Sequence, residues 1–243
     1  MKYFDEPGHG FQIDARDTMY PSLMTVLAGD VQDVGDRCST TYGFVVAGLF
    51  TVSSREGTFQ FEAEGGSFFA APGASVVTAR EPDGKVVLIT RWGYRAIPHF
   101  GVLEKKGRLS YIDGCSDSLL VPPQRLGDPC LNHLHFPTDI LQRQHTHPSI
   151  RMGVVVRGRG VAWRGKRGEV EDVAAYVRDA RDEGNLVWSH ELHAGGVFML
   201  EEQELHSFAT RSDEGMDIVA FHPDSDWGPT DETHPMLNRT HLK

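Results

Sequence analysis

Cysteine is scarce in this sequence. Three residues, Cys38, Cys115 and Cys130, occur among 243, and no Cys-x-x-Cys pair is present. An odd and widely spaced set does not make the disulfide framework on which small secreted domains depend. We therefore expect free thiols. Cys115 and Cys130 either line a pocket or are buried and inert, and the second state is the commoner one for cysteine.

Basic residues and long apolar runs are also few. Lys and Arg number 24 against 34 Asp and Glu, so the formal net charge is -10. An excess of negative charge disfavours nucleic acid and anionic membrane surfaces as partners. No apolar run approaches the roughly 20 residues that span a bilayer, and residues 1–7 lack the basic and apolar parts of a signal peptide. We expect a cytoplasmic protein without a nucleic-acid or membrane partner.

Helical periodicity is rare, and short strand-like runs separated by Gly, Pro or charged turns dominate. In the first half they are residues 22–27, 42–53, 58–62, 67–70, 75–78 and 85–92. Many short strands predict an all-β barrel or sandwich. The length allows one large β domain or two of about 100–120 residues each.

One stretch, residues 168–181, breaks the strand pattern. Val170, Val173, Ala174 and Val177 recur at the spacing of an amphipathic helix. A short helix inserted here would be either a lid over a barrel mouth or a plain surface insertion.

Histidines supply the most specific chemical signal. His145 and His147 are two residues apart, so on a strand their side chains point to the same face. His206 follows 59 residues after His147, on a later strand-like segment. A single histidine is more often a surface or core residue, but three in this pattern predict a metal site.

The surroundings of these histidines resemble the two-part motif of the cupin superfamily. The order is His-x-His, a run at 153–163 that reads as a hairpin around a glycine turn, a Gly-rich turn at 194–200, and the lone His206. The resemblance covers roughly residues 128–222. It implies a small double-stranded β-barrel that holds a metal ion in its mouth.

Arg151 stands where that family usually places a glutamate ligand. Arginine cannot ligate a cation, so the predicted ligand set reduces to His145, His147 and His206, with open positions for water or substrate. Arg151 either makes a salt bridge at the barrel rim or anchors a substrate carboxylate through its bidentate fork.

An internal repeat extends the resemblance to the first half. Residues 42–48 match 152–158, and residues 65–69 match 195–199. The chain thus resembles a bicupin, with Gly35 and Arg37 standing where His145 and His147 stand in the second half.

The repeat predicts the domain organisation. We expect two tandem cupin barrels of the jelly-roll, double-stranded β-helix type with a short inserted helix: a first barrel without metal ligands at 1–100, a linker at 101–127, and a metal-binding barrel at 128–243.

His133 and His135 are a further candidate pair, because they share one face of a predicted strand. Either one of them lines the cavity or both face solvent. We take His135, together with Arg151, as a candidate catalytic residue.

The second half also resembles the cupin domain of hydrazine synthetases, in which a cupin is fused to a methionyl-tRNA-synthetase-like domain. Four stretches carry the resemblance: residues 113–120, 126–132, 145–149 and 221–240. It implies a three-histidine zinc site that rearranges an N–O bond into an N–N bond, in an ester of an N-hydroxylated lysine and a second amino acid.

Chemistry alone leaves several functions open. Three neutral imidazoles leave a divalent ion its full charge, so it can polarise a bound oxygen. We expect Zn²⁺ with a small carboxylate-bearing substrate, and Fe²⁺ with an oxygenase reaction as the alternative. A non-catalytic ligand-binding barrel is the third candidate. A homodimer is a family-level expectation.

Overall fold

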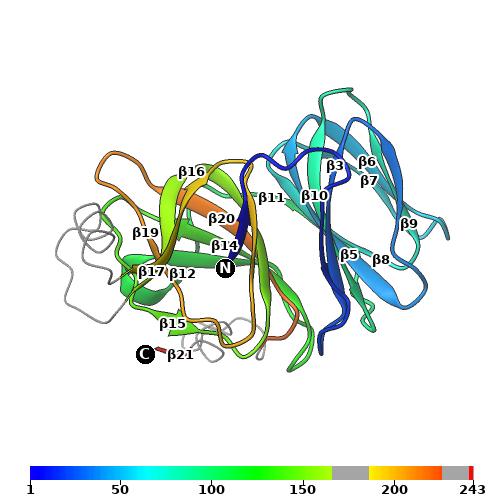
Figure 1. The fold of residues 1–243 in the computed structure, drawn as a ribbon. Helices are drawn as coiled ribbons and strands as arrows, with labels where there is room; N and C mark the ends of the chain where they lie inside the picture. The colour runs from blue at the N-terminus through cyan, green and yellow to red at the C-terminus, as the bar shows by residue number, and fades with distance from the viewer. Residues whose placement is uncertain (166–185, 226–240, 243) are drawn as a thin grey trace.

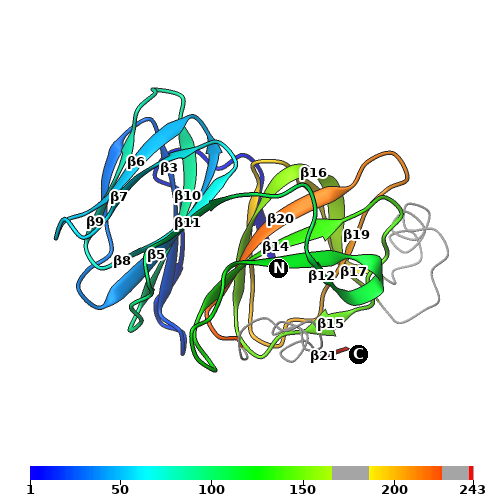
Figure 2. The same ribbon diagram turned by 180° about the vertical axis from the view of Figure 1, so that it is seen from behind.

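The computed structural model describes residues 1–165, 186–225 and 241–242, and their regular secondary structure is almost wholly β-strand (Figures 1 and 2). The strands of the first half are β1 (Lys2–Phe4), β2 (Gln12–Ala15), β3 (Ser22–Ala28), β4 (Val31–Val34), β5 (Ser39–Ala47), β6 (Leu49–Ser54), β7 (Gln60–Glu64), β8 (Ser67–Pro72), β9 (Ser75–Ala79), β10 (Lys85–Trp92) and β11 (His99–Val102). The six strands predicted there are confirmed, with 42–53 divided at Gly48 into β5 and β6.

The described residues of the second half contain one short 3₁₀ turn, Ile112–Gly114, and ten further strands. They are β12 (Leu109–Ser110), β13 (Ser116–Val121), β14 (Cys130–Phe136), β15 (His145–Thr146), β16 (Arg151–Gly165), β17 (Leu186–His193), β18 (Val197–Leu200), β19 (Ser207–Ala209), β20 (Met216–His222) and β21 (His241–Leu242). The helix predicted at 168–181 lies outside the described residues.

The strands form two barrels that lie side by side (Figure 1). The first combines a six-stranded sheet, β11-β8-β5-β10-β3-β2, with a four-stranded sheet, β4-β9-β6-β7. The second is built on a nine-stranded sheet, β1-β18-β16-β20-β14-β13-β12, with β17 and β19 paired to β16, and on the pair β15-β21. This is the predicted all-β architecture of two tandem jelly-roll barrels.

Three strands pair beyond the segment in which the sequence places them. β1 comes from the predicted first barrel, and β12 and β13 come from the predicted linker, yet all three pair within the sheet of the second barrel. The boundaries 1–100, 101–127 and 128–243 stay predictions. The chain crosses between the barrels at its start as well as in its middle.

The hairpin predicted at 153–163 is wrong. β16 is one strand of 15 residues that pairs first with β20 and then, beyond Gly158, with β17 and β19. Its register shifts between Val155 and Arg157, and Gly158 has a φ of +69°, which an L side chain rarely adopts. The glycine therefore bends one strand from sheet to sheet. Gly48, with a φ of +79°, lies between β5 and β6 in the first barrel.

The repeat is present in the structure with one change of register. Gly43 pairs with Phe69 and Gly153 pairs with Phe198, so Phe69 is the counterpart of Phe198. The sequence alignment of 65–69 with 195–199 instead matched Phe68 to Phe198, and is thus wrong by one residue. In a strand a shift of one residue exchanges the two faces of the sheet.

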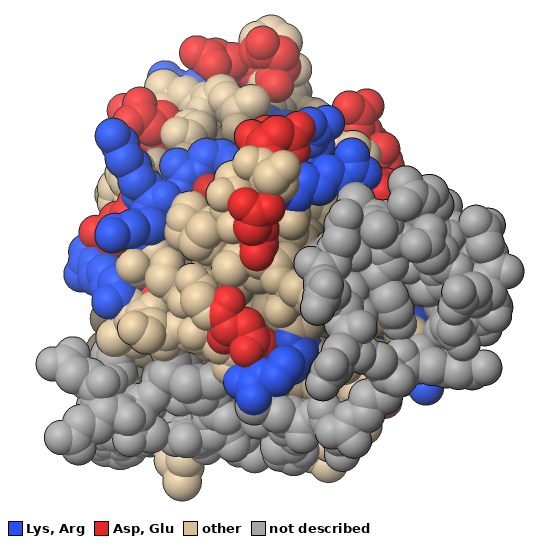
Figure 3. All heavy atoms as spheres, turned by 90° about the vertical axis from the view of Figure 1, so that its left-hand side faces the viewer, with Lys and Arg blue, Asp and Glu red and all other residues tan. Residues whose placement is uncertain are grey.

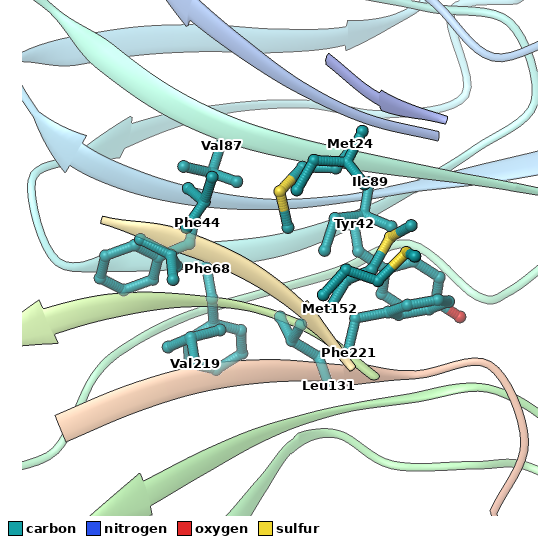
Figure 4. Packing of buried hydrophobic residues seen from close by; sticks show 14 of the residues in the cluster. Met24, Tyr42, Phe44, Phe68, Val87, Ile89, Leu131, Met152, Val219 and Phe221 are labelled. Atoms are coloured by element: carbon teal, nitrogen blue, oxygen red, sulfur yellow. The ribbon is translucent and has the colours of Figure 1, made fainter. Parts of the chain in front are cut away.

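The cores follow the two barrels and the seam between them. Apolar side chains that include Val45, Phe50 and Val77 fill the first barrel. A separate cluster packs Phe136 and Phe198 inside the second. A third cluster packs at the seam between the two barrels. Its side chains labelled in Figure 4 are Met24, Tyr42, Phe44, Phe68, Val87 and Ile89 from the first barrel, and Leu131, Met152, Val219 and Phe221 from the second.

The surface and the thiols agree with the composition. Basic and acidic side chains lie interspersed on the visible described face in Figure 3, without a continuous basic stripe. Cys38 is exposed, Cys115 and Cys130 are buried, and all three are free. Within the described parts of the chain, no helix is long and apolar enough to cross a membrane.

Candidate metal centre

The structure brings the three predicted histidines together inside the second barrel. The ring centroids of His145 and His206 are 4.4 Å apart, and His147 lies 5.1 Å from each of them. All three side chains are buried. Each ring offers one nitrogen to a set whose members all lie within 4.8 Å of one another.

Backbone pairing explains this convergence. His145 and His206 form an antiparallel bridge, in which each backbone N–H donates to the other carbonyl at 2.9 and 3.1 Å. Residues directly opposite in an antiparallel pair present their side chains on the same face. His147 comes two residues after His145, so its ring joins the same face.

Two hydrogen bonds fix the ring orientations. Nδ1 of His145 lies 2.9 Å from the carbonyl oxygen of Arg143, and Nδ1 of His206 lies 2.9 Å from that of Glu204. A carbonyl oxygen only accepts, so each Nδ1 carries the proton and each Nε2 keeps a lone pair. Nε2 of His206 is buried and has no partner among the described residues. Metal-binding histidines are commonly oriented in this way.

Burial keeps the imidazoles neutral. It lowers the pKa of His145 to about 4. Burial, followed by the positive charge of Arg151, lowers the pKa of His147 well below the usual value. The pKa of His206 is likewise far below its usual value, because of burial and then the neighbouring His145. Neutral imidazole is the form that binds a metal ion.

The donor set fits a divalent transition metal. Bonds of about 2.0–2.1 Å to a tetrahedral ion place the ligand nitrogens roughly 3.3 Å apart, within the spacing of these three rings. Three neutral nitrogens without a carboxylate suit zinc, iron and other first-row ions alike. The geometry supports a three-histidine site and leaves the choice between Zn²⁺ and Fe²⁺ open.

Arg151 lines the same cavity, and hydrogen bonds from one of its nitrogens fix its side chain. Its Nη1 donates to the carbonyls of Ser149 (3.2 Å) and Ile150 (2.9 Å), to the Ser149 hydroxyl, and to Oδ1 of Asp224 at 3.4 Å. Burial lowers the pKa of the guanidinium, and the Asp224 carboxylate opposes that shift. Nε and Nη2 are buried without a partner among the described residues. Two nitrogen donors of the positively charged guanidinium are thus available to a ligand.

The cavity around these groups is small and largely apolar. Its lining consists of Tyr111, Leu134, Phe136, Gln142, His145, His147, Arg151, Phe198, Leu200, His206, Phe208, Ala220 and His222. About 20 Å³ is available to the centres of water-sized molecules. Since one water needs roughly 10–15 Å³ on this measure, the space holds an ion and very few waters.

Three polar residues of this lining carried no role in the sequence interpretation: Tyr111, Gln142 and His222. The ring of His222 lies 6.2 Å from that of His147. Alternation along β20 was the available signal, because Ile218, Ala220 and His222 occupy one strand face.

His135 is not brought to the cavity. Leu134 and Phe136 on either side of it line the cavity, so His135 points to the opposite face of β14. Its Nδ1 lies 2.9 Å from Oδ1 of Asp217. The structure thus joins Arg151 to the three histidines and places His135 elsewhere.

Comparison with solved structures identifies the architecture. A protein from Pseudomonas aeruginosa described as glyoxylate-induced has a TM-score of 0.60 and 15% identity, over 88% of this chain and 79% of that chain. A cupin 2 conserved barrel domain protein from Leptotrichia buccalis has a TM-score of 0.57 and 12% identity, over 90% and 95%. The chain has the cupin fold. Bacillus subtilis oxalate decarboxylase, which has Mn(II) centres, has a TM-score of 0.54 and 10% identity, over 88% of this chain and 72% of that chain.

The cupin likeness concerns the fold alone, because identities this low do not carry an activity from one protein to another. No family model matches the sequence, and no curated protein matches it. Function has to be argued from the cavity.

Proposed function

We propose that this cupin is a metal-dependent enzyme that acts on a small, carboxylate-bearing metabolite. One observation carries the proposal: Arg151, whose Nε and Nη2 have no partner among the described residues, lines the same cavity as three neutral histidines. A buried guanidinium with free donors is costly unless an anion satisfies it. A planar carboxylate is the anion that matches a bidentate fork.

The chain's own groups have separable tasks in this proposal. His145, His147 and His206 offer three lone pairs to an ion, which supplies Lewis-acid polarisation of a substrate oxygen when bound. Arg151 holds the substrate carboxylate, and Asp224 fixes Arg151 in place. Apolar walls such as Phe198 keep bulk water away and strengthen these electrostatic interactions.

The size of the cavity restricts the substrate. With about 20 Å³ available to the centres of water-sized molecules, the cavity receives only a carboxylate-sized group in this conformation. A larger substrate therefore enters by its carboxylate end or requires the walls to move. This favours substrates with a carboxylate close to the reacting atoms.

Within this class, the resemblance to hydrazine synthetases gives a specific reaction. In an ester of an N-hydroxylated lysine and a second amino acid, the amine nitrogen attacks the hydroxylamine nitrogen, and the N–O bond breaks. The ester oxygen leaves as part of the amino acid's carboxylate, and the attacking amine loses a proton. In this reaction Arg151 binds the carboxylate that forms.

An oxygenase is the second candidate. It is favoured by the apolar walls, which include Phe136, Phe198 and Phe208, because a dry cavity suits dioxygen as co-substrate. Three neutral histidines bind Fe²⁺ as well as Zn²⁺. Dioxygen consumption by the iron-loaded protein with a carboxylate substrate distinguishes the two candidates.

The metal test is elemental analysis of protein purified without added metal, beside His145→Ala and His206→Ala. We expect the metal bound at this centre to be lost in both variants, because each removes one of three ligands. His9→Ala is the matched control, since His9 is exposed in the first half of the chain. Undiminished metal in both ligand variants would contradict the site.

The test of Arg151 is carboxylate binding. Arg151→Lys keeps a positive charge without the bidentate fork, so we expect affinity for small carboxylates to fall at least tenfold. Arg159→Gln, at an exposed ion pair with Asp213, is the control and should bind as wild type. Metal binding and carboxylate affinity without turnover of any trial substrate would support the non-catalytic barrel instead.

A further inference from the structure

A second group of potential ligands lies on the outer face of the second barrel. Oδ1 of Asp217 is 2.7 Å from Nε2 of His133 and 2.9 Å from Nδ1 of His135. The three ligand atoms all lie within 4.8 Å of one another. His133 is fully buried, and the exposed fractions of the His135 and Asp217 side chains are 24% and 10%. Two imidazoles and one carboxylate thus converge on one point.

This cluster is separate from the three-histidine centre. Along β14 the side chains alternate, and Leu134 and Phe136 line the inner cavity while His133 and His135 face away from it. On β20, Ala220 and His222 line the cavity and Asp217 faces outward. The sheet itself lies between the two groups.

Neighbouring strands hold the cluster in place. His135 is directly opposite Asp217 in the antiparallel pairing of β14 with β20, and His133 is opposite Val219. Sites built on paired strands are more rigid than sites on loops. The geometry is therefore set by backbone pairing and not by the hydrogen bonds alone.

Arg157 orients the carboxylate. Its Nε donates to Oδ2 of Asp217 at 2.9 Å, and its Nη2 donates to the carbonyl of Glu104 at 2.7 Å. Oδ2 is thereby occupied, and Oδ1 is directed at both rings. Carboxylates that ligate metals are commonly held by such a hydrogen bond on the other oxygen.

We propose that His133, His135 and Asp217 form a second site for a divalent transition-metal ion, distinct from the three-histidine centre. Two imidazole nitrogens and one carboxylate oxygen suit Zn²⁺ and its first-row neighbours. Ligands of a tetrahedral ion stand roughly 3.3 Å apart, so the distance from Oδ1 of Asp217 to each ring nitrogen needs to widen by only about half an ångström. An ion here replaces the two protons that the rings otherwise share with one oxygen.

The ion has a route to this site from solvent. His135 lines a surface hollow together with Gly107, Ser116 and Pro137. An ion therefore enters without passing the inner cavity. An ion at the outer site links β14 to β20. Asp217 in turn contacts Arg157, which donates a hydrogen bond to the carbonyl of Glu104 in the segment between the barrels.

The experiment is a metal count on protein stripped with a chelator and dialysed. Co²⁺ is titrated and followed by its visible absorption, and Zn²⁺ is titrated by calorimetry. We expect two equivalents in the wild type and one in His135→Ala, in Asp217→Asn and in His206→Ala. The double variant His135→Ala/His206→Ala should bind none. His193→Ala, at an exposed histidine, is the control and keeps both equivalents.

Metal binding at one site serves as the control for variants of the other site. The equivalent retained by His135→Ala and Asp217→Asn belongs to the inner centre and shows that the barrel has folded. Asp217→Asn preserves side-chain shape in case His135→Ala does not fold. The proposal is overturned if both variants bind as many ions as the wild type. It is also overturned if the wild type binds one equivalent that His206→Ala removes, because the cluster is then a hydrogen-bonded network only.

Discussion

Burial decides what single ionisable residues can do in this protein. His145, His147 and His206 are neutral because burial lowers the pKa of each, to about 4 at His145. Burial likewise raises the pKa of Cys115 and of Cys130 to about 12. The same physical cause thus makes imidazoles available as ligands and thiols unavailable as nucleophiles.

The thiols give a residue-scale prediction. With iodoacetamide at about pH 8, we expect the native protein to be alkylated at Cys38, which is exposed, and not at Cys115 or Cys130. Thiolate is the reactive form, and a pKa of about 12 leaves very little of it. Peptide mass spectrometry locates the label. Cys38→Ser should take up none until denaturant is added, and labelling of native Cys115 would contradict the prediction.

Residue types and spacing were enough to find the three histidines, since a two-residue spacing on a strand fixes a common face. The same rule places His133 and His135 together but does not say whether that face is inside or outside the barrel. Tyr111 reaches the cavity from the turn after β12, where no local pattern marks an inward face, whereas the alternation along β20 was a usable signal for His222.

At the scale of elements, the two barrels repeat one close contact. A Cβ atom at Gly43 would lie 2.1 Å from the ring of Phe69, and one at Gly153 would lie 2.4 Å from the ring of Phe198. In each barrel the aromatic ring therefore occupies the space above a glycine of the paired strand. Absence of a side chain is required at both positions.

Gly43→Ala tests this requirement. We expect a loss of roughly 1–3 kcal/mol in the free energy of unfolding, because Phe69 is fully buried and its ring has no room to move. Denaturant unfolding gives the value. Adding Phe69→Leu should recover part of the loss.

Gly8→Ala is the control for that experiment, because nothing lies within 4 Å of a Cβ built at Gly8. Its effect should stay within about 0.5 kcal/mol. If Gly43→Ala and Gly8→Ala were equally stable, the prediction would be contradicted, because β5 and β8 would then move apart to admit the methyl group without a loss of stability.

Strand existence was more predictable than strand connection. Apolar alternation and flanking turn residues located β3, β8, β9 and β10. The glycines at 158 and 160 were interpreted as a hairpin turn, whereas Gly158 bends β16 between two sets of partners. A glycine with positive φ serves both purposes, and the sequence contains no local sign of which strands are available for pairing.

At the scale of the whole molecule, the two barrels share a core. The rings of Tyr42 and Phe221 lie 5.0 Å apart across the seam, within a cluster that draws buried side chains from both barrels. A hydrogen bond also crosses the seam, because the Tyr20 hydroxyl donates to Oδ2 of Asp224 at 3.4 Å. A seam of this kind couples the stability of one barrel to that of the other.

Phe221→Ala tests the coupling. The wild type should unfold in one calorimetric transition, and Phe221→Ala should lower its stability by about 3–5 kcal/mol and separate the unfolding of the two barrels. Phe50→Ala, in the interior of the first barrel, is the matched control. It should cost a similar amount without weakening the seam, so the single transition persists. Two transitions in the wild type would contradict a shared core.

The sequence by itself determined the strand content, the presence of two related halves and the three histidines, because strand periodicity and ligand spacing are local properties. Only the tertiary structure decided which face of β14 looks inward, that β16 continues through its glycines, and that two nitrogens of Arg151 have no partner in the described part of the chain. Those features depend on which strands pair across long separations. Pairing of that kind is set by the packing of the whole barrel and not by any short stretch of residues.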